Sequence, residues 1–441
     1  MYTLRKLFAE FRVFLFLCKA TGTAPISFDR ESGRVVVRKR ARFYCVSVVL
    51  VILLCAVSDI VWKATNGYRN FESITKYTYV FTVAVATSSA VTCILWNSSL
   101  KQNDVHFFFL KMVTVGTFLY NDKEAEYIRL NTLLLRGTIV VIVYSVLLYG
   151  NMLWDNGITL KYFSDTPVHV IHFLRNILLL QFMVLNGAVG RNFAQLNENL
   201  LQVFEISSEN ESDIKISETL QFSLSKQNTY NTGNLFIREF SSPSTLVVSK
   251  AQASSKHPTY NIPRCNRMAL QTDSCVSMKH LRKIYCILSD LAKAVDRAYG
   301  PNNLFEVTSS FVNIVALLYT FAVFLLQLDG TSRISLYDCI TTLQWTVMLV
   351  CRLFSIAYSC DMVVQEANRT QRLVTKLQML SAGCGCQEEL QLFGEQLARN
   401  TLHYSAAGFF TLDLSLLKSI VAAATTYFVI LVQFQVSGNK S

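Results

Sequence analysis

The sequence has little proline and little charge. Its 441 residues include 6 Pro, and 16% are Asp, Glu, Lys or Arg, whereas a soluble domain carries about 25% charged residues. The low charge argues against an ordinary soluble protein. The 12 Cys are scattered, several of them inside apolar runs, and they show none of the paired pattern that secreted domains use for disulfides.

Catalytic motifs are also missing. The sequence has no Gly-rich phosphate loop, nucleophile elbow or metalloprotease helix, so we expect neither an enzyme nor a cofactor. Cys384 and Cys386 with His403 lack the second Cys pair of a structural zinc site, so no metal is expected. A net charge of +11 is compatible with nucleic-acid binding. The excess Lys and Arg fall in predicted cytoplasmic loops, however, and we expect no nucleic-acid partner.

Long apolar runs make up much of what is present. Hydrophobic residues form 51% of the chain and the mean hydropathy is +0.32. The runs are too long and continuous for the alternating strands of a membrane β-barrel. We predict an all-α, polytopic membrane protein with seven transmembrane helices, at residues 43–62, 77–96, 138–154, 168–189, 304–328, 336–357 and 409–435.

Positive charge predicts the orientation of these spans. Of the 41 Lys and Arg, 32 fall in one alternate set of connecting segments and 6 in the other. Positively charged loops stay in the cytoplasm, so the N-terminus is expected inside and the C-terminus outside. G-protein-coupled receptors have seven spans in the opposite orientation, which argues against that class.

The segments between the spans differ in pattern. Residues 206–278 are polar without sustained periodicity, which predicts a disordered insert. Helical periodicity on both sides of the insert, and after the sixth span, predicts helices that continue into a cytoplasmic anchor bundle. The predicted units are a cytoplasmic N-terminal segment (1–42, with residues 13–18 in an amphipathic helix), spans one to four (43–190), a cytoplasmic loop with the insert (191–303), spans five and six (304–357), anchor helices (358–408), the seventh span (409–435) and an extracellular tail (436–441).

The last span has a stripe of small and weakly polar residues. Ser419, Ala423, Thr426, Ile430 and Gln433 share one helix face. Such a face suits either close helix packing or the wet lumen of a pore.

Three charges inside predicted spans are candidates for ion pairs. Arg352 either reaches the inner interface or pairs with Glu306, since both lie near the inner ends of their spans. Arg175, in the outer half of its span, either pairs with Asp155 or Asp165 or lines a polar ligand pocket.

Polar and aromatic side chains also gather in the outer and middle parts of spans four to six. A sugar site needs aromatic faces and amide groups, whereas an alkaloid site needs more aromatics and fewer hydrogen bonds. Each residue alone is more often core than ligand, and the pattern does not separate the two ligand classes. The candidates are Gln181, His172, His169, Tyr319, Asn313, Gln344 and Trp345.

The last span ends in Thr426-Tyr427, five apolar residues and Gln433-Phe434. This pattern resembles the C-terminal signature of insect gustatory receptors at every position. Weaker resemblances occur in FLCKATGTAP (16–25), AYGPNNLFEVTSSFVNIVALLY (298–319) and GFFTLDLSLLKSIVAAATTY (408–427). The resemblance covers most of the chain outside 206–278.

The resemblance implies a tastant-gated, non-selective cation channel for taste perception in the plasma membrane of sensory neurons. The implied assembly is a homotetramer, or a heteromer with other gustatory receptors, around a pore lined by the last helix. The implied ligand is a small sugar or bitter compound, and Gln433 and Phe434 would form the constriction. An odorant-type receptor subunit is the close alternative. A secondary transporter is a more distant one, because paired, Gly/Pro-interrupted spans are lacking.

Overall fold

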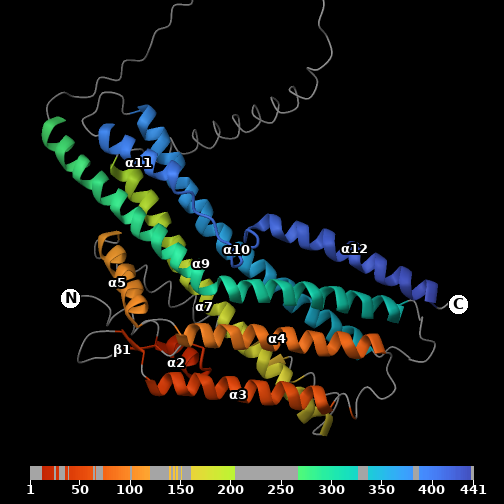
Figure 1. Cartoon of the computed structure of the whole chain (residues 1–441). Coiled ribbons are helices and arrows are strands. Elements are labelled where there is room, and N and C mark those ends of the chain that lie inside the picture. Colours follow the sequence, from red (N-terminus) through yellow and green to blue (C-terminus); the bar gives the residue numbers. More distant parts are fainter. Residues whose placement is uncertain are drawn as a thin grey trace, which may run out of the picture.

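The computed structural model describes residues 12–23, 26–28, 35–37, 39–62, 65, 73–99, 102–119, 160–203, 267–325, 336–380 and 387–438, with isolated positions between 139 and 150. These residues are almost entirely helical (Figure 1). The helices are α2 (Arg12–Ala20), α3 (Lys39–Trp62), α4 (Ser73–Ser99), α5 (Gln102–Leu119), α7 (Leu160–Val203), α9 (Arg267–Leu325), α10 (Leu336–Leu380), α11 (Gln387–Arg399) and α12 (Leu414–Gly438).

A short β-hairpin departs from the predicted all-α class. Strand β1 (Ile26–Phe28) pairs in antiparallel register with β2 (Val35–Val37), between α2 and α3. Three consecutive β-branched residues in β2 favour extended backbone over helix. The hairpin packs beside α5, so it belongs to the N-terminal part of the bundle.

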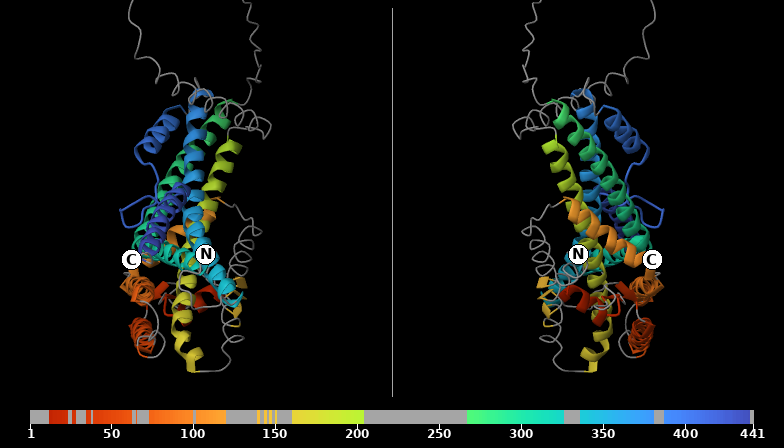
Figure 2. Two further views of the ribbon diagram at one scale, coloured as in Figure 1. Left: turned by 90° about the vertical axis from the view of Figure 1, so that its right-hand side faces the viewer. Right: turned by 90° about the vertical axis from the view of Figure 1, so that its left-hand side faces the viewer.

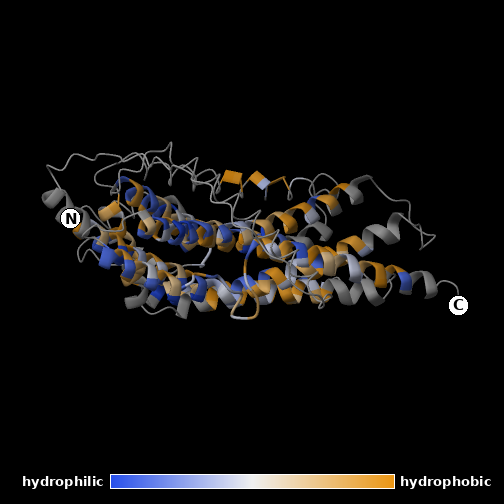
Figure 3. Cartoon of the chain, turned by 90° about the horizontal axis from the view of Figure 1, so that it is seen from above, coloured by the Kyte–Doolittle hydropathy of each residue, from blue (hydrophilic) through white to orange (hydrophobic). Residues whose placement is uncertain are grey.

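Three helices, α7, α9 and α10, are much longer than the others. Helices α7, α9 and α10 extend beyond α3 and α4 toward α11, which packs on α9 and α10 (Figure 1). These continuous helices are the extensions that the periodicity predicts. Figure 3 shows hydrophilic residues concentrated in this half and apolar residues in the other. Helix α9 bends near its middle, and it contains Pro301, which removes a backbone donor and kinks a helix.

The long helices run in two opposite directions. Helix α3, the second half of α9 and α12 run away from the α11 end, whereas α4, α7 and α10 run toward it (Figures 1 and 2). Helices α4 and α7 thus run the same way, and the third predicted span, 138–154, falls between them. Most of that span lies outside the described residues.

Hydropathy and length identify three candidate spans among the described residues: Arg40–Trp62, Val168–Gln202 and Leu343–Met379. Shorter apolar stretches lie within α4 (Val80–Thr92), α5 (Phe107–Leu119) and α12 (Leu414–Ile430). Residues 304–325 of the fifth predicted span lie within α9, which has a buried polar face described below.

The predicted bounds of the insert are wrong in part, and one further helix was not predicted. The insert was expected to reach residue 278, but α9 begins at Arg267, and Met278 is fully buried in the core. The segment after the second predicted span, for which the sequence analysis gave no secondary structure, contains α5, whose Val115 and Leu119 are buried. In both places, packing against α7 or α9 stabilises helices that their own periodicity signals weakly.

The seventh span was predicted to begin at residue 409, but α12 begins at Leu414. Residues before it form a turn in which Ala407 and Gly408 have positive φ, 51° and 82°. The carboxylate of Asp413 accepts a hydrogen bond from the Leu416 N–H at 3.0 Å. An Asp in this position caps the first turn of a helix and fixes its start.

Candidate functional site

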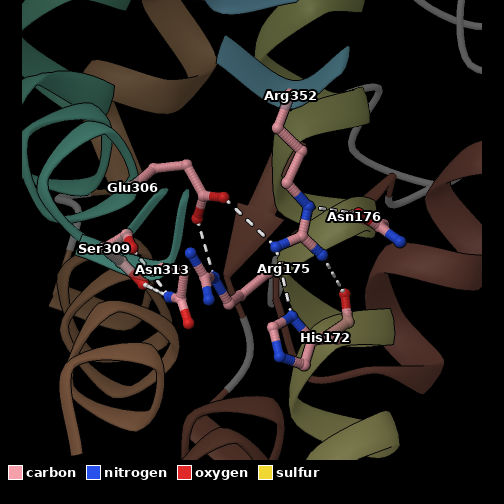
Figure 4. Close-up of polar contacts among 7 residues, drawn as sticks. All are labelled: His172, Arg175, Asn176, Glu306, Ser309, Asn313 and Arg352. Atoms are coloured by element: carbon pink, nitrogen blue, oxygen red, sulfur yellow. Dashed lines mark hydrogen bonds and ion pairs between the residues drawn. The ribbon is translucent and has the colours of Figure 1, made fainter. Parts of the chain in front are cut away.

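One carboxylate binds two guanidinium groups inside the bundle. Arg175 of α7 donates from Nε to Glu306 Oε2 of α9 at 2.8 Å, and Arg352 of α10 donates from Nη1 to Glu306 Oε1 at 3.3 Å (Figure 4). The three side chains are 0%, 4% and 2% exposed. Charges in such a place are costly unless paired, and they commonly mark function in membrane proteins. We call these three residues the charge cluster.

Helix periodicity explains how Glu306 reaches this place. Polar residues of α9 recur at intervals of three and four after Pro301, which puts them within about 120° of one another around the helix. All of them are buried, two directly before and four within the fifth predicted span. They are Asn302, Asn303, Glu306, Ser309, Ser310 and Asn313, and we call them the polar face of α9.

Arg352 makes further contacts with α7. Its Nε donates to Asn176 Oδ1 at 2.8 Å, and its Nη2 donates to the His172 carbonyl oxygen at 3.0 Å. Its Nη1 lies 3.2 Å from His172 Nδ1. Arginine can only donate, so Nδ1 accepts and the imidazole proton lies on Nε2. These contacts fix α7 and α10 against each other at the level of the cluster.

Aromatic side chains border the cluster on one side. The Trp345 ring lies 4.8 Å from the His172 ring and 5.5 Å from the His169 ring, centroid to centroid. Tyr144 donates to the Gln344 carbonyl oxygen at 2.9 Å. Four of the residues predicted from sequence as ligand candidates therefore meet in one region: His172, His169, Gln344 and Trp345.

Arg175 has a partner that the sequence analysis did not name. It pairs with Glu306, the carboxylate that Arg352 also contacts, whereas Asp155 and the side chain of Asp165, the partners expected from sequence, lie outside the described residues. Sequence position placed Arg175 in the outer half of its span and Arg352 near an inner end. Arg175 and Arg352 contact the same carboxylate, so they lie at the same depth in the bundle. Helices α7 and α10 cross the bundle at an angle to the other helices, which brings these two positions together.

The other candidates lie elsewhere on these helices. Asn313 donates to its own helix, to the Ser309 carbonyl oxygen at 2.7 Å, and Tyr319 is partly buried farther along α9. Gln181 donates to Thr23 Oγ1 and accepts from Tyr299 OH at 3.3 Å. Nine residues after His172, Gln181 is about 13 Å farther along α7. It therefore joins the N-terminal segment to the bundle.

A second polar group anchors the chain before α12. Asp296 of α9 accepts from the Ser405 N–H at 2.9 Å, and Tyr404 donates to Asn186 of α7 at 2.9 Å. Burial raises the pKa of the Asp296 carboxyl, although its bonds to Ser405 oppose this. A Cβ at Gly300 would lie 3.2 Å from the Ala407 N. Sequence reasoning missed this contact. Its signal in the sequence is the glycine at position 300, where a side chain would crowd the backbone of Ala407.

The candidate pore residues lie on a helix with one open face. Helix α12 packs on α9 and α10, and Phe311 of α9 contacts Tyr427 with ring centroids 6.0 Å apart. In this single chain Thr426, Tyr427, Ile430 and Gln433 are exposed, Tyr427 by 54%. The side chain of Phe434 lies outside the described set.

Long apolar helices, a hydrophilic bundle at one end and buried, paired charges define a polytopic helical membrane protein. The chain belongs to the 7tm Chemosensory receptor family, whose sequence pattern matches residues 11–232 and 245–438.

Individual relatives are distant in sequence. The putative gustatory receptor 2a of Drosophila melanogaster is 29% identical over 175 residues, covering 36% of this chain and 41% of its own. The gustatory receptor for sugar taste 43a of the same species is 24% identical over 271 residues, covering 61% and 58%. The chain thus spans about half the length of the curated relatives it matches.

The fold is also known from experiment. The insect olfactory receptor OR5 from Machilis hrabei matches with a TM-score of 0.58 and 11% identity, over 98% of this chain and 99% of that one. The same receptor in complex with eugenol matches with a TM-score of 0.50 and 13% identity. At this identity the likeness concerns the fold.

Proposed function

We propose that this chain is a gustatory receptor, a cation channel opened by a small-molecule tastant. The observation that carries the proposal is α12, an apolar helix whose stripe of small and polar residues is open to other subunits. Membership of the chemosensory receptor family and the gustatory names of its relatives support it. The assembly would be a homotetramer, or a heteromer with other gustatory receptors, in the plasma membrane of sensory neurons.

The geometry suggests how a ligand signal reaches α12. Glu306 and Phe311 lie on one helix, five residues or about 7.5 Å apart along its axis. A ligand bound among α7, α9 and α10 would displace α9 at the charge cluster. The contact between Phe311 and Tyr427 would pass this movement to α12. Two arrangements of a packed, hydrogen-bonded element are the usual basis of such a switch.

The gate in this proposal is the end of α12. A ring of Phe434 side chains would close the axis by excluding water, and no charged plug would be needed. Gln433, one residue earlier and exposed in the single chain, would supply polar groups for passing cations. The orientation predicted from charge would put this constriction toward the outside.

Expression of the full chain in oocytes tests the proposal. A panel of sugars and bitter compounds should evoke a weakly selective cation current. Uninjected oocytes are the control, and the gate variant Phe434→Ala should pass current without ligand. A saturable flux coupled to an ion gradient, with no channel current, would indicate a transporter. A response to volatile odorants and to none of the tastants would favour the odorant-type alternative.

A further inference from the structure

The charge cluster has more hydrogen-bond donors than acceptors. Arg175 uses Nε for Glu306, but its Nη1 and Nη2 are buried and have no hydrogen-bond partner within the described part of the chain. A buried guanidinium nitrogen without an acceptor is costly, by more than a neutral group in the same place. The position therefore suits an additional acceptor.

The net charge of the charge cluster indicates that this acceptor is an anion. Two guanidinium groups share one carboxylate, so the cluster has a formal charge of +1. His172 accepts from Arg352 and adds no negative charge. A second carboxylate would balance the cluster, and the fork of a guanidinium binds both carboxylate oxygens side by side.

Two further unsatisfied groups lie on the polar face of α9. Asn303 Nδ2 and Ser310 Oγ are buried and have no hydrogen-bond partner among the described residues. Both lie within about 60° of Glu306 around the helix. Nδ2 can only donate and a hydroxyl can donate as well. These two groups, on the same face of α9 as Glu306, thus favour an acceptor-rich molecule over a donor-rich one.

We propose that the ligand of this receptor carries a carboxylate, which binds Nη1 and Nη2 of Arg175 beside Glu306. This inference rests on the proposed function, because it gives the chemical class of the receptor's ligand. Binding at the site can still be measured without recording a current. Trp345, whose ring lies 4.8 Å from the His172 ring and is tilted by 58° to it, offers an aromatic face next to the cluster for the rest of the molecule. Arg175 then distinguishes acids from their neutral counterparts.

Formate is the smallest carboxylate probe, and formamide is its neutral match. The full chain is purified in nanodiscs, and its unfolding temperature is followed against each probe, with chloride keeping the ionic strength constant. Formate should raise the temperature in a saturable way, whereas formamide should not. Arg175→Lys retains one cation for Glu306 but has no guanidinium fork, and it should weaken the apparent formate affinity at least tenfold.

Arg297→Lys is the matched control, because Arg297 is exposed on α9 and donates to the Lys293 carbonyl oxygen of its own helix. It should leave formate binding unchanged. Absence of a saturable formate effect, or an equal effect in Arg175→Lys, would overturn the proposal and indicate that water satisfies Arg175. Formate binding without any ligand-evoked current would support the site and contradict the channel function. Currents evoked by neutral tastants alone, in a protein that does not bind formate, would support the channel function and contradict the carboxylate site.

Discussion

Removal of the shared carboxylate is the strongest test of the charge cluster. In Glu306→Gln, two buried guanidinium groups lose their only anionic partner among the described residues, at 2.8 and 3.3 Å. Breaking a buried ion pair by removing one partner costs about 3–5 kcal/mol. Total folding stabilities are about 5–15 kcal/mol, so we expect most of the variant to be retained inside the cell.

A matched variant on the surface isolates the effect of burial. Glu395 pairs with Arg399 at 3.8 Å, with side chains 51% and 81% exposed. Such a pair contributes about 0–1 kcal/mol, and Glu395→Gln should leave surface expression close to wild type. The measurements are surface biotinylation in expressing cells and thermal unfolding of the purified full chain.

A second substitution tests whether the loss comes from stranded charge. Adding Arg352→Met to Glu306→Gln removes one of the two unpaired cations, and it should restore part of the surface expression. If Glu306→Gln is tolerated as well as Glu395→Gln, or if the second substitution only adds damage, the assignment of a buried, electrostatically coupled cluster is refuted.

Three further predictions follow from other parts of the chain. Phe434→Ala should raise the resting current while ligand responses persist, and channels of this variant that stay as tightly closed as wild type would contradict the gate. Deletion of residues 222–264 should leave assembly and ligand response intact, because loop closure depends weakly on length; loss of both surface expression and current would show that the segment is structural. Burial raises the pKa of Asp296 in the folded protein above its ordinary value of 3.8, so the folded state binds this proton more tightly. Wild type should therefore gain stability relative to Asp296→Asn as the pH falls from 7 through the raised pKa, and a difference in unfolding temperature that is independent of pH would contradict this.

The sequence was sufficient for features that depend on local pattern. Apolar runs and three- to four-residue periodicity predict long helices, and the structure has them in α7, α9 and α10. The family followed from a short run in α12, because Thr426-Tyr427 and Gln433-Phe434 with five apolar residues between them form a recognisable pattern. Orientation and the number of spans remain predictions from charge and hydropathy.

Local signals were misleading where packing decides the structure. The start of α9 lies in a polar stretch, yet Met278 is buried there. The start of α12 was placed five residues too early, because Phe409, Phe410 and Leu412 are apolar; a backbone bridge between Ser405 and Thr411 keeps this segment out of the helix, and Asp413 caps the first turn. The three Val of β2 form a strand because a partner strand is available.

Charge and spacing suggested that Arg352 meets Glu306, but only the tertiary structure brought Arg175 to the same carboxylate, 131 residues away along the chain. It also joined Gln181 to Thr23 and Tyr404 to Asn186, over 158 and 218 residues. Periodicity determines which face of a helix is buried, since the backbone repeats every few residues. The depth at which two such faces meet depends on the crossing of long helices, which is fixed by the packing of the whole bundle.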